Sequence, residues 1–213
     1  MRKQQTREKI LEAAREIFSE KGYHGTTVSD IIGKVGMAQG SFYNYFENKR
    51  SIFMELLEDF ISKVEQAASS FHVNDVKDRN TYTVMAVSIA AAIGYVFQEN
   101  EKLARIFFHE AMGIDEEINE IIDRAYRSLV ATSLKFIRRG QEIGVIRKDI
   151  PAEIMAGANV GMGTFLVNRY LRGEYNEFRP EQLIITPVSI QLDGFLQENL
   201  DNKKDHENVQ QPS

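Results

Sequence analysis

Apolar side chains recur along most of this chain at the spacing of one face of an α-helix. In the N-terminal region, residues at i, i+3, i+4, i+7 and i+8 form one apolar stripe: Ile10, Ala13, Ala14, Ile17 and Phe18. Alternation of the kind found in β-strands is sparse, and proline occurs only at positions 151, 180, 187 and 212. The pattern therefore predicts an all-α protein.

Four helices are predicted in the first third of the chain. The first ends near Gly22, since glycine suits a helix C-terminus. Residues 27–30, Thr-Val-Ser-Asp, form a capping box that opens a short second helix. A third short helix is predicted over residues 39–46, and Asn48 caps a long fourth one. Two short helices joined by a tight turn after a longer helix form a helix-turn-helix pattern.

The rest of the chain reads as a larger helical domain, so that about nine helices are expected in all. We expect a helix-turn-helix domain over residues 1–50, a second domain over residues 51–200 and a disordered polar tail over residues 201–213. The further helices are predicted at about 79–99, 101–112, 115–143, 151–171 and 181–200.

Residues 80–98 carry no charge and raise the question of a membrane span. The strongly apolar part covers about 16 residues, fewer than the roughly 20 that a spanning helix needs. Polar residues dilute it further: Asn80, Thr81, Thr83, Ser88 and Gln98. We therefore favour a helix buried centrally in the second domain.

Composition narrows the class of protein. The chain has 213 residues and no cysteine, which excludes disulfides, thiolate metal sites and cysteine nucleophiles. Its N-terminus lacks an apolar signal-peptide region, and a cytoplasmic location is expected. Net charge is −5, yet residues 1–50 hold nine Lys and Arg against six Asp and Glu, a net +3. A basic first domain on an acidic remainder suits an anion-binding module joined to a different unit.

The segment GMAQGSFYNYFENKRS, residues 36–51, contains the third predicted helix. Phe42 and Phe46 are four residues apart and share one face, which we expect to be core. The other face has no acid and carries groups that hydrogen-bond to adenine or to phosphate: Gln39, Gly40, Ser41, Tyr43 and Asn44. Thr27 and Lys49, at helix N-termini, are candidate phosphate contacts. These residues favour DNA binding, although a small helical bundle with a polar face has the same pattern.

The stretch from Thr6 to Phe53 resembles the N-terminal domain of the TetR/AcrR family of bacterial transcriptional regulators. The resemblance rests on residues in unbroken spacing: Ala14, Phe18, Gly22, Tyr23, Thr27, Val28, Ile31, Gly36, Gly40, Tyr43, Phe46 and Lys49. It implies that phosphates are held by Thr27, Tyr43 and Lys49. It also implies that Ser29, Gln39, Gly40, Ser41 and Asn44 lie at base edges and Tyr45 at the groove rim.

Three positions depart from the family pattern. Ile32 and Val35 stand where alanine is more usual, which predicts altered helix packing. Ala38 stands where a serine usually caps the recognition helix. Losing such a cap typically costs about 1 kcal/mol, so Ala38→Ser is expected to stabilise the protein.

The resemblance also implies that the second domain binds a ligand and forms a homodimer through its last two long helices. Glycine is unfavourable inside a helix, yet one predicted helix contains Gly157, Gly161 and Gly163. Three explanations stay open: close crossing of two helices, room for a ligand, or glycines that the helix simply tolerates. A stripe on the last helix is either core or interface, and the resemblance favours interface. The predicted dimer residues are Gly157, Gly161, Ile184, Val188, Leu192, Phe195 and Leu196.

Met and aromatic stripes in the second domain suggest a soft apolar pocket, although such stripes are more often plain core. The expected ligand is small and hydrophobic or amphipathic, with His109, Asn159 and Arg169 as polar candidates. The predicted apolar lining is Met85, Ile89, Ile93, Phe97, Phe107, Phe108, Met112, Tyr126, Met155, Met162 and Phe165.

Other classes of function find little support in the sequence. The four histidines have no metal-ligand spacing, and no phosphate loop or nucleophile elbow is present, so neither an enzyme, a metal site nor a cofactor is expected. A helical adaptor, or a regulator controlled by a protein partner, fits an acidic second domain equally well. The leading interpretation is a homodimeric repressor of a palindromic DNA operator, released by a ligand.

Overall fold

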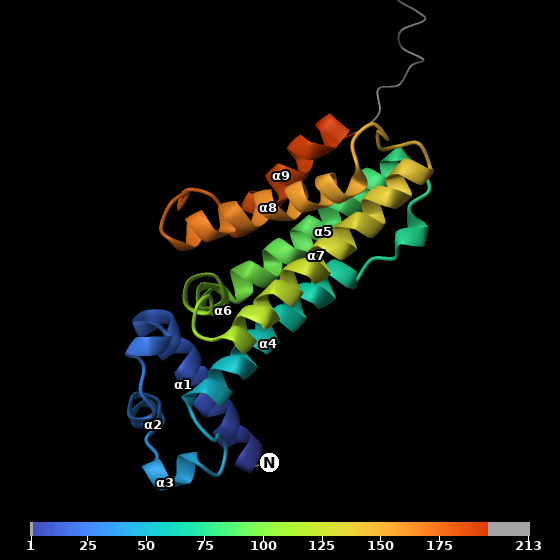
Figure 1. Cartoon of the computed structure of the whole chain (residues 1–213). Coiled ribbons are helices and arrows are strands. Elements are labelled where there is room, and N and C mark those ends of the chain that lie inside the picture. The colour runs from blue at the N-terminus through green and yellow to red at the C-terminus, as the bar shows by residue number, and fades with distance from the viewer. Residues whose placement is uncertain (1, 196–213) are drawn as a thin grey trace, which may run out of the picture.

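The structure is a computed structural model and describes residues 2–195. Within this range the secondary structure is helical, without a β-strand, which confirms the all-α prediction. The first three helices form a small lobe, here called the head, at one end of an elongated molecule (Figure 1). Helices α5 to α9 form the larger lobe, called the body, and α4 runs from one into the other (Figure 1). The predicted tail over residues 201–213 lies outside the described residues.

The head helices begin and end for local reasons. Helix α1 spans Arg2–Gly25 and passes through the predicted stop with a break at Gly22, whose φ is 73°. Helix α2, Val28–Val35, opens with the predicted capping box between Thr27 and Asp30. Helix α3, Gln39–Phe42, is shorter than the predicted helix over 39–46. The reason lies in residues 43–45, Tyr-Asn-Tyr, which have weak helix propensity and form a turn instead.

Helix α4 spans Lys49–Ser69, and Asn48 caps it through reciprocal bonds with Ser51, as predicted. The 3₁₀ turn η1 (Val73–Asp75) then leads to α5 (Arg79–Glu99). The predicted helix over 101–112 is divided into α6 (Glu101–Arg105) and a π-helix, η2 (Ile106–Glu110). The remaining helices are α7 (Glu116–Glu142), α8 (Ala152–Leu171) and α9 (Pro180–Phe195).

Helix α5 is the described helix that is long and apolar enough to cross a membrane by length and composition. It packs between α4 and α9, yet only 22% of its most apolar window is buried. The predicted helix does lie between other helices of the body, but it is less buried within the described chain than the prediction of a centrally buried helix implied. Val84 and Tyr95 are exposed by 57% and 61%, and much of the rest faces a cavity in the body.

Two glycines that the sequence did not single out allow helices to approach closely. A Cβ on Gly94 would lie 2.6 Å from the Cα of Glu181, so α9 could not rest on α5 there. A Cβ on Gly140 would overlap the side chains of Ile146 and Tyr82. Close packing within the chain therefore requires glycine at these two positions, whereas it does not require the glycines of α8.

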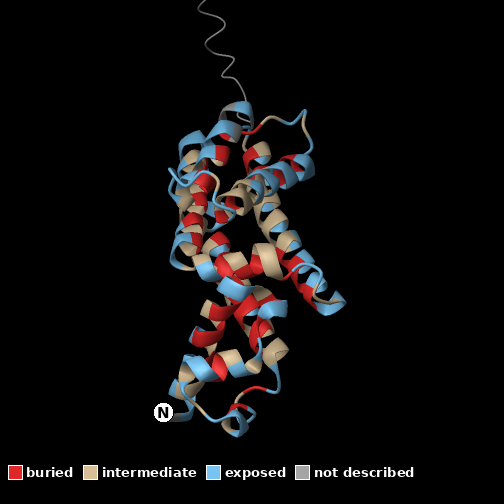
Figure 2. Ribbon diagram, turned by 90° about the vertical axis from the view of Figure 1, so that its left-hand side faces the viewer, coloured by how far each residue is buried: buried red, intermediate tan, exposed pale blue. Residues whose placement is uncertain are grey.

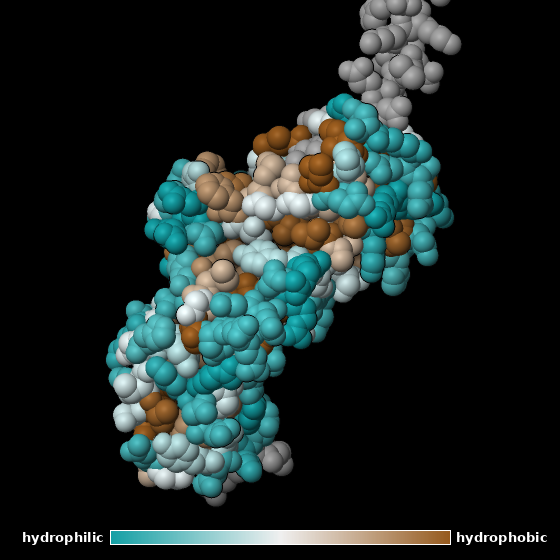
Figure 3. Space-filling view, in the orientation of Figure 1, coloured by the Kyte–Doolittle hydropathy of each residue, from teal (hydrophilic) through white to brown (hydrophobic). Residues whose placement is uncertain are grey.

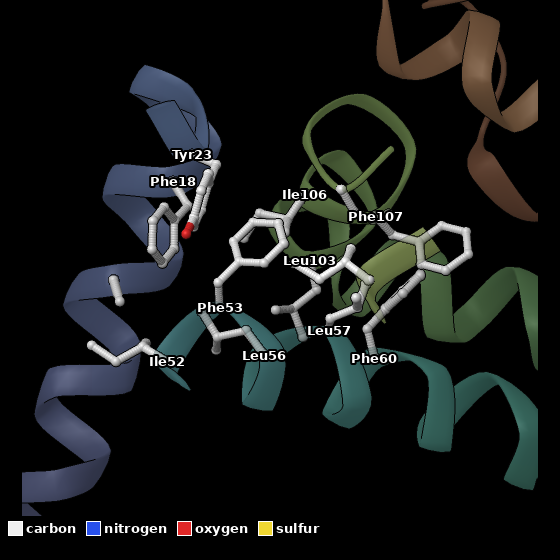
Figure 4. Close-up of a cluster of buried hydrophobic side chains, with 14 of the residues drawn as sticks. Phe18, Tyr23, Ile52, Phe53, Leu56, Leu57, Phe60, Leu103, Ile106 and Phe107 are labelled. Carbon is white, nitrogen blue, oxygen red and sulfur yellow. The ribbon is translucent and has the colours of Figure 1, made fainter. Parts of the chain in front are cut away.

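Buried residues form a continuous core from the head into the body (Figure 2). Phe53 of α4 packs edge-to-face on Phe18, with ring centroids 5.3 Å apart, and lies 4.8 Å from Tyr23 (Figure 4). Further along α4, Phe60 contacts Phe107 of η2 at 5.6 Å (Figure 4). The apolar core therefore does not break at the predicted domain boundary at residue 50. A second, smaller cluster lies at the far end of the body, around Val76, Ile137 and Ile146.

Candidate nucleic-acid interface and body cavity

The segment after Gly36 sorts its side chains between core and solvent as the sequence predicts. Phe42 is fully buried and Phe46 is 4% exposed, so both belong to the head core. Tyr43 is 57% exposed and rests edge-on against Phe42, with ring centroids 5.4 Å apart. Gln39, Gly40 and Asn44 are exposed, and Ser41 and Tyr45 are half-buried. The segment thus presents amide, hydroxyl and phenol groups on a face that no other described part of the chain covers.

Gly40 is not required by the packing of the head. A Cβ built on it meets no atom within 4 Å, and its backbone lies inside the short helix α3. Glycine costs helix stability relative to alanine, so an open position offers no reason for it within the chain. The absence of a side chain here is what close approach of an external surface requires.

Lys49 makes contacts inside the head. Its ammonium donates hydrogen bonds to the carbonyl oxygens of Tyr23 and Thr26, each at 2.8 Å. It also lies 4.5 Å from the centroid of the Tyr23 ring. The cation therefore completes the C-terminal end of α1 and fixes α4 to the head, and most of its donor capacity is spent there.

Thr27 and Ser29 are exposed at the N-terminus of α2. The Thr27 hydroxyl donates to the Asp30 carboxylate at 2.6 Å and accepts from the Asp30 N–H at 3.1 Å. These bonds, together with Lys21, hold the pKa of Asp30 well below its usual range. The Thr27 hydroxyl and N–H are thus both engaged by the Asp30 carboxylate, and Ser29 stays accessible.

Most cations of the head are paired with carboxylates. Apart from Lys49, which donates to backbone carbonyls, the exceptions among the described side chains are Lys3 and Lys9, which are exposed on the first three turns of α1 and make no ion pair with described residues. These turns lie at the same end of the molecule as α3 (Figure 1). They therefore suit phosphate contacts that the sequence reasoning missed. The paired cations are Arg7 with Glu55, Arg15 with Glu12, Lys21 with Asp30, Lys34 with Glu16, and Arg50 with Asp115 and Glu117.

The body contains a cavity of about 140 Å³ bounded by α4, α5, α7, α8 and α9. Four of the predicted pocket residues line it: Ile89, Ile93, Phe97 and Asn159. The lining also includes residues that the sequence did not single out, among them Tyr82, Thr132, Ser133 and Thr164. Hydroxyl residues on a helix carry no sequence signal that distinguishes a cavity wall from a solvated face.

The other predicted pocket residues do not line this cavity. Phe107, Phe108 and Tyr126 pack together in the core near the head, and Met85 and Met155 belong to the second core cluster. Arg169 pairs with Glu174. The remainder lie on the surface or in η2: Met112, exposed by 65%, Phe165, exposed by 60%, Met162, exposed by 37%, and His109.

His109 lies in the π-helix η2 instead of the cavity wall. Burial lowers its pKa, so the ring is neutral at physiological pH. Its Nε2 is buried and has no hydrogen-bond partner among the described residues. The ring instead hydrogen-bonds to the backbone of Asn168 on α8, with the charges of Arg105, Arg172 and Glu110 nearby, so it belongs to the contact between η2 and α8.

The predicted dimer residues on α9 also need correction. Ile184 is 8% exposed, Leu192 is 7% exposed and Val188 is half-buried, because α9 turns this stripe toward α5 within the chain. The Phe195 side chain and Leu196 lie outside the described residues. Gly157 and Gly161 on α8 are exposed, with open space at each Cβ position.

An exposed apolar stripe does occur on the last two helices, in different residues. On α8, Ile154 is 64% exposed and Phe165 is 60% exposed, one on either side of the two glycines. On α9, Ile190 is 61% exposed. Hydrophobic surface accordingly gathers over α8 and α9, whereas the head is mostly hydrophilic (Figure 3). We call this surface the α8–α9 stripe.

No cluster of three or more His, Asp or Glu able to hold a metal ion occurs among the described residues. The arrangement has two features of chemical interest, the uncovered polar face of α3 and the apolar cavity. Neither brings together a nucleophile with a base.

Comparison with known proteins places these features in context. Residues 10–56 match the sequence profile described as "Bacterial regulatory proteins, tetR family". The chain is 29% identical over 195 residues to the uncharacterized HTH-type transcriptional regulator YdgC of Bacillus subtilis, covering 90% of this chain and 93% of that protein. It is 28% identical over 151 residues to the HTH-type transcriptional repressor DhaR of Mycobacterium sp., covering 70% and 74%.

Among solved structures, a TetR-family regulator from Syntrophomonas wolfei superimposes with a TM-score of 0.68 at 26% identity, over 92% of this chain and 99% of that one. Proteins of this kind are DNA-binding transcriptional regulators and not enzymes. Three observations point to the same kind of protein. They are the helix-turn-helix head, the all-helical body and the similarity to these regulators over most of their length. The chain is therefore similar to TetR-family bacterial transcriptional regulators, in the head by its sequence profile and over most of its length by overall similarity.

Proposed function

We propose that this protein is a homodimeric repressor that binds a palindromic DNA operator in the cytoplasm and releases it when a small apolar molecule enters the body. The observation that carries the DNA-binding part is the uncovered face of α3. Gln39 and Asn44 can make bidentate bonds to adenine, Tyr43 and Ser41 can bond phosphate, and Gly40 lets the backbone approach a groove. Tyr45 is half-buried and lies beside this face, at the rim.

Phosphate contacts would come chiefly from Lys3, Lys9 and the Tyr43 hydroxyl. Thr27 and Lys49 contribute less than the sequence suggested, since both are engaged inside the head. Because few cations of the head are free, we expect the affinity for DNA to fall only gently with salt concentration. Each neutralised phosphate adds about 0.9 to the steepness of log K plotted against log salt concentration. Residues 1–50 would serve as the DNA-binding domain and residues 51–200 as the sensing and dimerising domain.

A dimer explains how one short recognition helix can select an operator. Two such helices about 34–36 Å apart read half-sites in successive major grooves. The α8–α9 stripe is the apolar surface best suited to self-association, since Gly157 and Gly161 let a partner helix come close between Ile154 and Phe165. Repression agrees with the similarity to DhaR, which is an HTH-type transcriptional repressor.

Ligand control follows from the cavity and from α4. This helix supplies cavity wall at Val64 and Ala68 and, at its other end, core contacts to the head through Phe53. A ligand that binds one arrangement of α4 more tightly than another would favour that arrangement in proportion to the difference in affinity. The distance between the two heads of the dimer would then change with it.

Binding-site selection from random DNA tests the proposal. We expect a palindrome whose half-sites are one helical turn apart, bound by a protein dimer in fluorescence anisotropy. Gln39→Ala and Asn44→Ala should weaken binding to the selected site by at least 10-fold and relax its sequence at distinct positions. Selection of no consensus, or of a consensus insensitive to both substitutions, would contradict the proposal. Release of DNA by a purified protein and not by small molecules would replace ligand control with a protein partner.

A further inference from the structure

The cavity in the body is lined without any charged residue. Its wall is formed by 20 described residues, and none of them is Asp, Glu, Lys, Arg or His. The only polar side chains in this wall belong to Tyr82, Thr132, Ser133, Asn159 and Thr164. Burial raises the pKa of Tyr82 to about 12, so its phenol is also neutral at physiological pH.

The polar groups of α7 and α8 meet at one place on the wall. The Asn159 amide donates from Nδ2 to the Ser133 hydroxyl at 3.1 Å. The Asn159 carbonyl oxygen accepts no hydrogen bond from any described residue, and the Ser133 hydroxyl keeps its own proton to donate. Thr164 gives its hydroxyl to the backbone oxygen of Val160 at 2.8 Å. Asn159 and Ser133 together thus offer one acceptor and one donor to a bound molecule.

From these contacts we infer that the cavity selects an uncharged, elongated apolar molecule with a single hydroxyl- or carbonyl-type polar end, held by Asn159 and Ser133. The inference deepens the proposed function, on which it rests for its regulatory meaning. An ionised carboxylate or ammonium would lose its hydration and find no opposite charge in the wall, which is costly. A hydroxyl or carbonyl would lose less and recover a hydrogen bond at the Asn159–Ser133 pair.

The length of the wall agrees with an elongated occupant. Its α7 side runs from Leu129 to Ile137, about 12 Å at the helical rise, and its α5 side is longer. Gly163 of α8 lies in this wall, and a Cβ there would meet no atom within 4 Å. The glycine therefore provides room for a ligand, one of the explanations left open by the sequence, and marks a position where the cavity can be filled without a clash.

Three probes of equal chain length test the inference: 1-octanol, octanoate and octylammonium. Binding to the full chain at pH 7 without DNA is measured by calorimetry and by the shift in melting temperature. We expect octanol to bind and to raise the melting temperature, and the two ions to bind at least 100-fold more weakly. Octanoate or octylammonium binding as tightly as octanol would overturn the inference, as would the absence of binding by all three.

Two variants locate the binding. Gly163→Leu fills the cavity and should weaken octanol binding at least 10-fold, whereas the matched Ala131→Leu, on the exposed face of α7, should not. Asn159→Leu keeps the branched shape of the side chain, removes the polar end and should also weaken octanol binding, which covers the case in which Gly163→Leu fails to fold. Octanol binding that neither change diminishes would show that it occurs elsewhere.

Operator binding separates this inference from the proposed function. If octanol binds the cavity but leaves affinity for the selected operator unchanged, ligand control fails while the ligand class stands. If no operator is bound at all, the proposed function fails, and the order of affinities among the three probes still decides the chemistry of the cavity.

Discussion

The carboxylate of Glu110 accepts a hydrogen bond at 3.1 Å from the backbone N–H of Tyr23, and so joins the body to the head. Glu110 is the last residue of the π-helix η2, where the N–H of Ala111 bonds to the carbonyl of Ile106, five residues back. The bond is possible because Gly22 has no side chain: a Cβ there would lie 2.5 Å from the Glu110 carboxylate. Glycine at position 22 thus serves both a left-handed backbone, with φ of 73°, and an inter-domain contact.

This contact predicts coupled effects of two substitutions. Gly22→Ala should destabilise the protein by more than the ~1–2 kcal/mol of left-handed strain, because the added Cβ displaces Glu110. Glu110→Ala should cost about 1–2 kcal/mol by removing a bond to a charged acceptor. In the Glu110→Ala background, Gly22→Ala should cost less than it does alone, since the clash is gone. Urea unfolding of the four proteins measures this coupling, and strictly additive effects would contradict it.

A second head–body contact predicts a pH dependence. Arg50 of α4 donates to Asp115 at the start of α7, at 2.8 and 3.2 Å, and its guanidinium holds the Asp115 pKa below its usual range. A carboxyl whose folded pKa is depressed stabilises the fold above its ordinary pKa, near 4, and loses that contribution as pH falls.

Asp115→Asn isolates this charge, because asparagine still caps α7. The wild type should melt at a higher temperature than the variant at pH 7, and the two melting temperatures should converge as the pH falls below about 5. Thermal melts across this range measure the difference. A gap of constant size would mean that the charge of Asp115 contributes nothing.

The start of α3 predicts a stabilising change. Ala38 occupies the N-cap with extended backbone, φ −72° and ψ 142°, and makes no side-chain cap bond. Ala38→Ser should let a hydroxyl accept from the free N–H groups of α3, for a gain of about 0.5–1 kcal/mol. Chemical denaturation tests this, with Ala38→Val as a control that cannot accept the bond and should gain nothing. Equal stability of the serine variant and the wild type would refute the prediction.

The exposed phenol of Tyr43 predicts a loss of DNA binding without a loss of fold. Tyr43→Phe removes only a hydroxyl that makes no hydrogen bond with described residues, so the melting temperature should stay within about 2 °C of the wild type. Affinity for the selected operator should fall about 5- to 20-fold if the hydroxyl bonds a phosphate. Phe42→Leu, a core change, should instead lower stability. Unaltered operator affinity of Tyr43→Phe would remove this residue from the interface.

The α8–α9 stripe predicts a monomeric variant. Phe165→Glu places a charge on an apolar surface and should dissociate the dimer by more than 10-fold in sedimentation equilibrium, with loss of operator binding. Met112→Glu is the matched control, equally exposed at 65% but in the turn near the head, and should leave the dimer intact. A Phe165→Glu protein that remains dimeric would place the interface elsewhere.

Local patterns in the sequence sufficed for much of the fold and for which side chains of the segment after Gly36 face solvent. The predicted caps at Thr27 and Asn48 and the apolar spacing on each helix are short-range features, because they depend on residues three or four apart. The inward turn of Phe42 and Phe46, and the outward turn of Tyr43 and Asn44, follow from the same helical period. Residues 43–46 nevertheless fell outside α3, since helix ends depend on small differences in propensity.

What the sequence could not decide is which residues of different helices meet. Ile184 and Leu192 form a stripe equally suited to core or interface, and only the packing of α9 on α5, through Gly94, turns them inward. The same holds for the cavity, whose polar pair joins Ser133 of α7 to Asn159 of α8 across 26 positions of sequence. Helical periodicity fixes the faces of each helix, whereas the rotation and crossing of helices depend on the summed packing of many distant side chains, which no local pattern encodes.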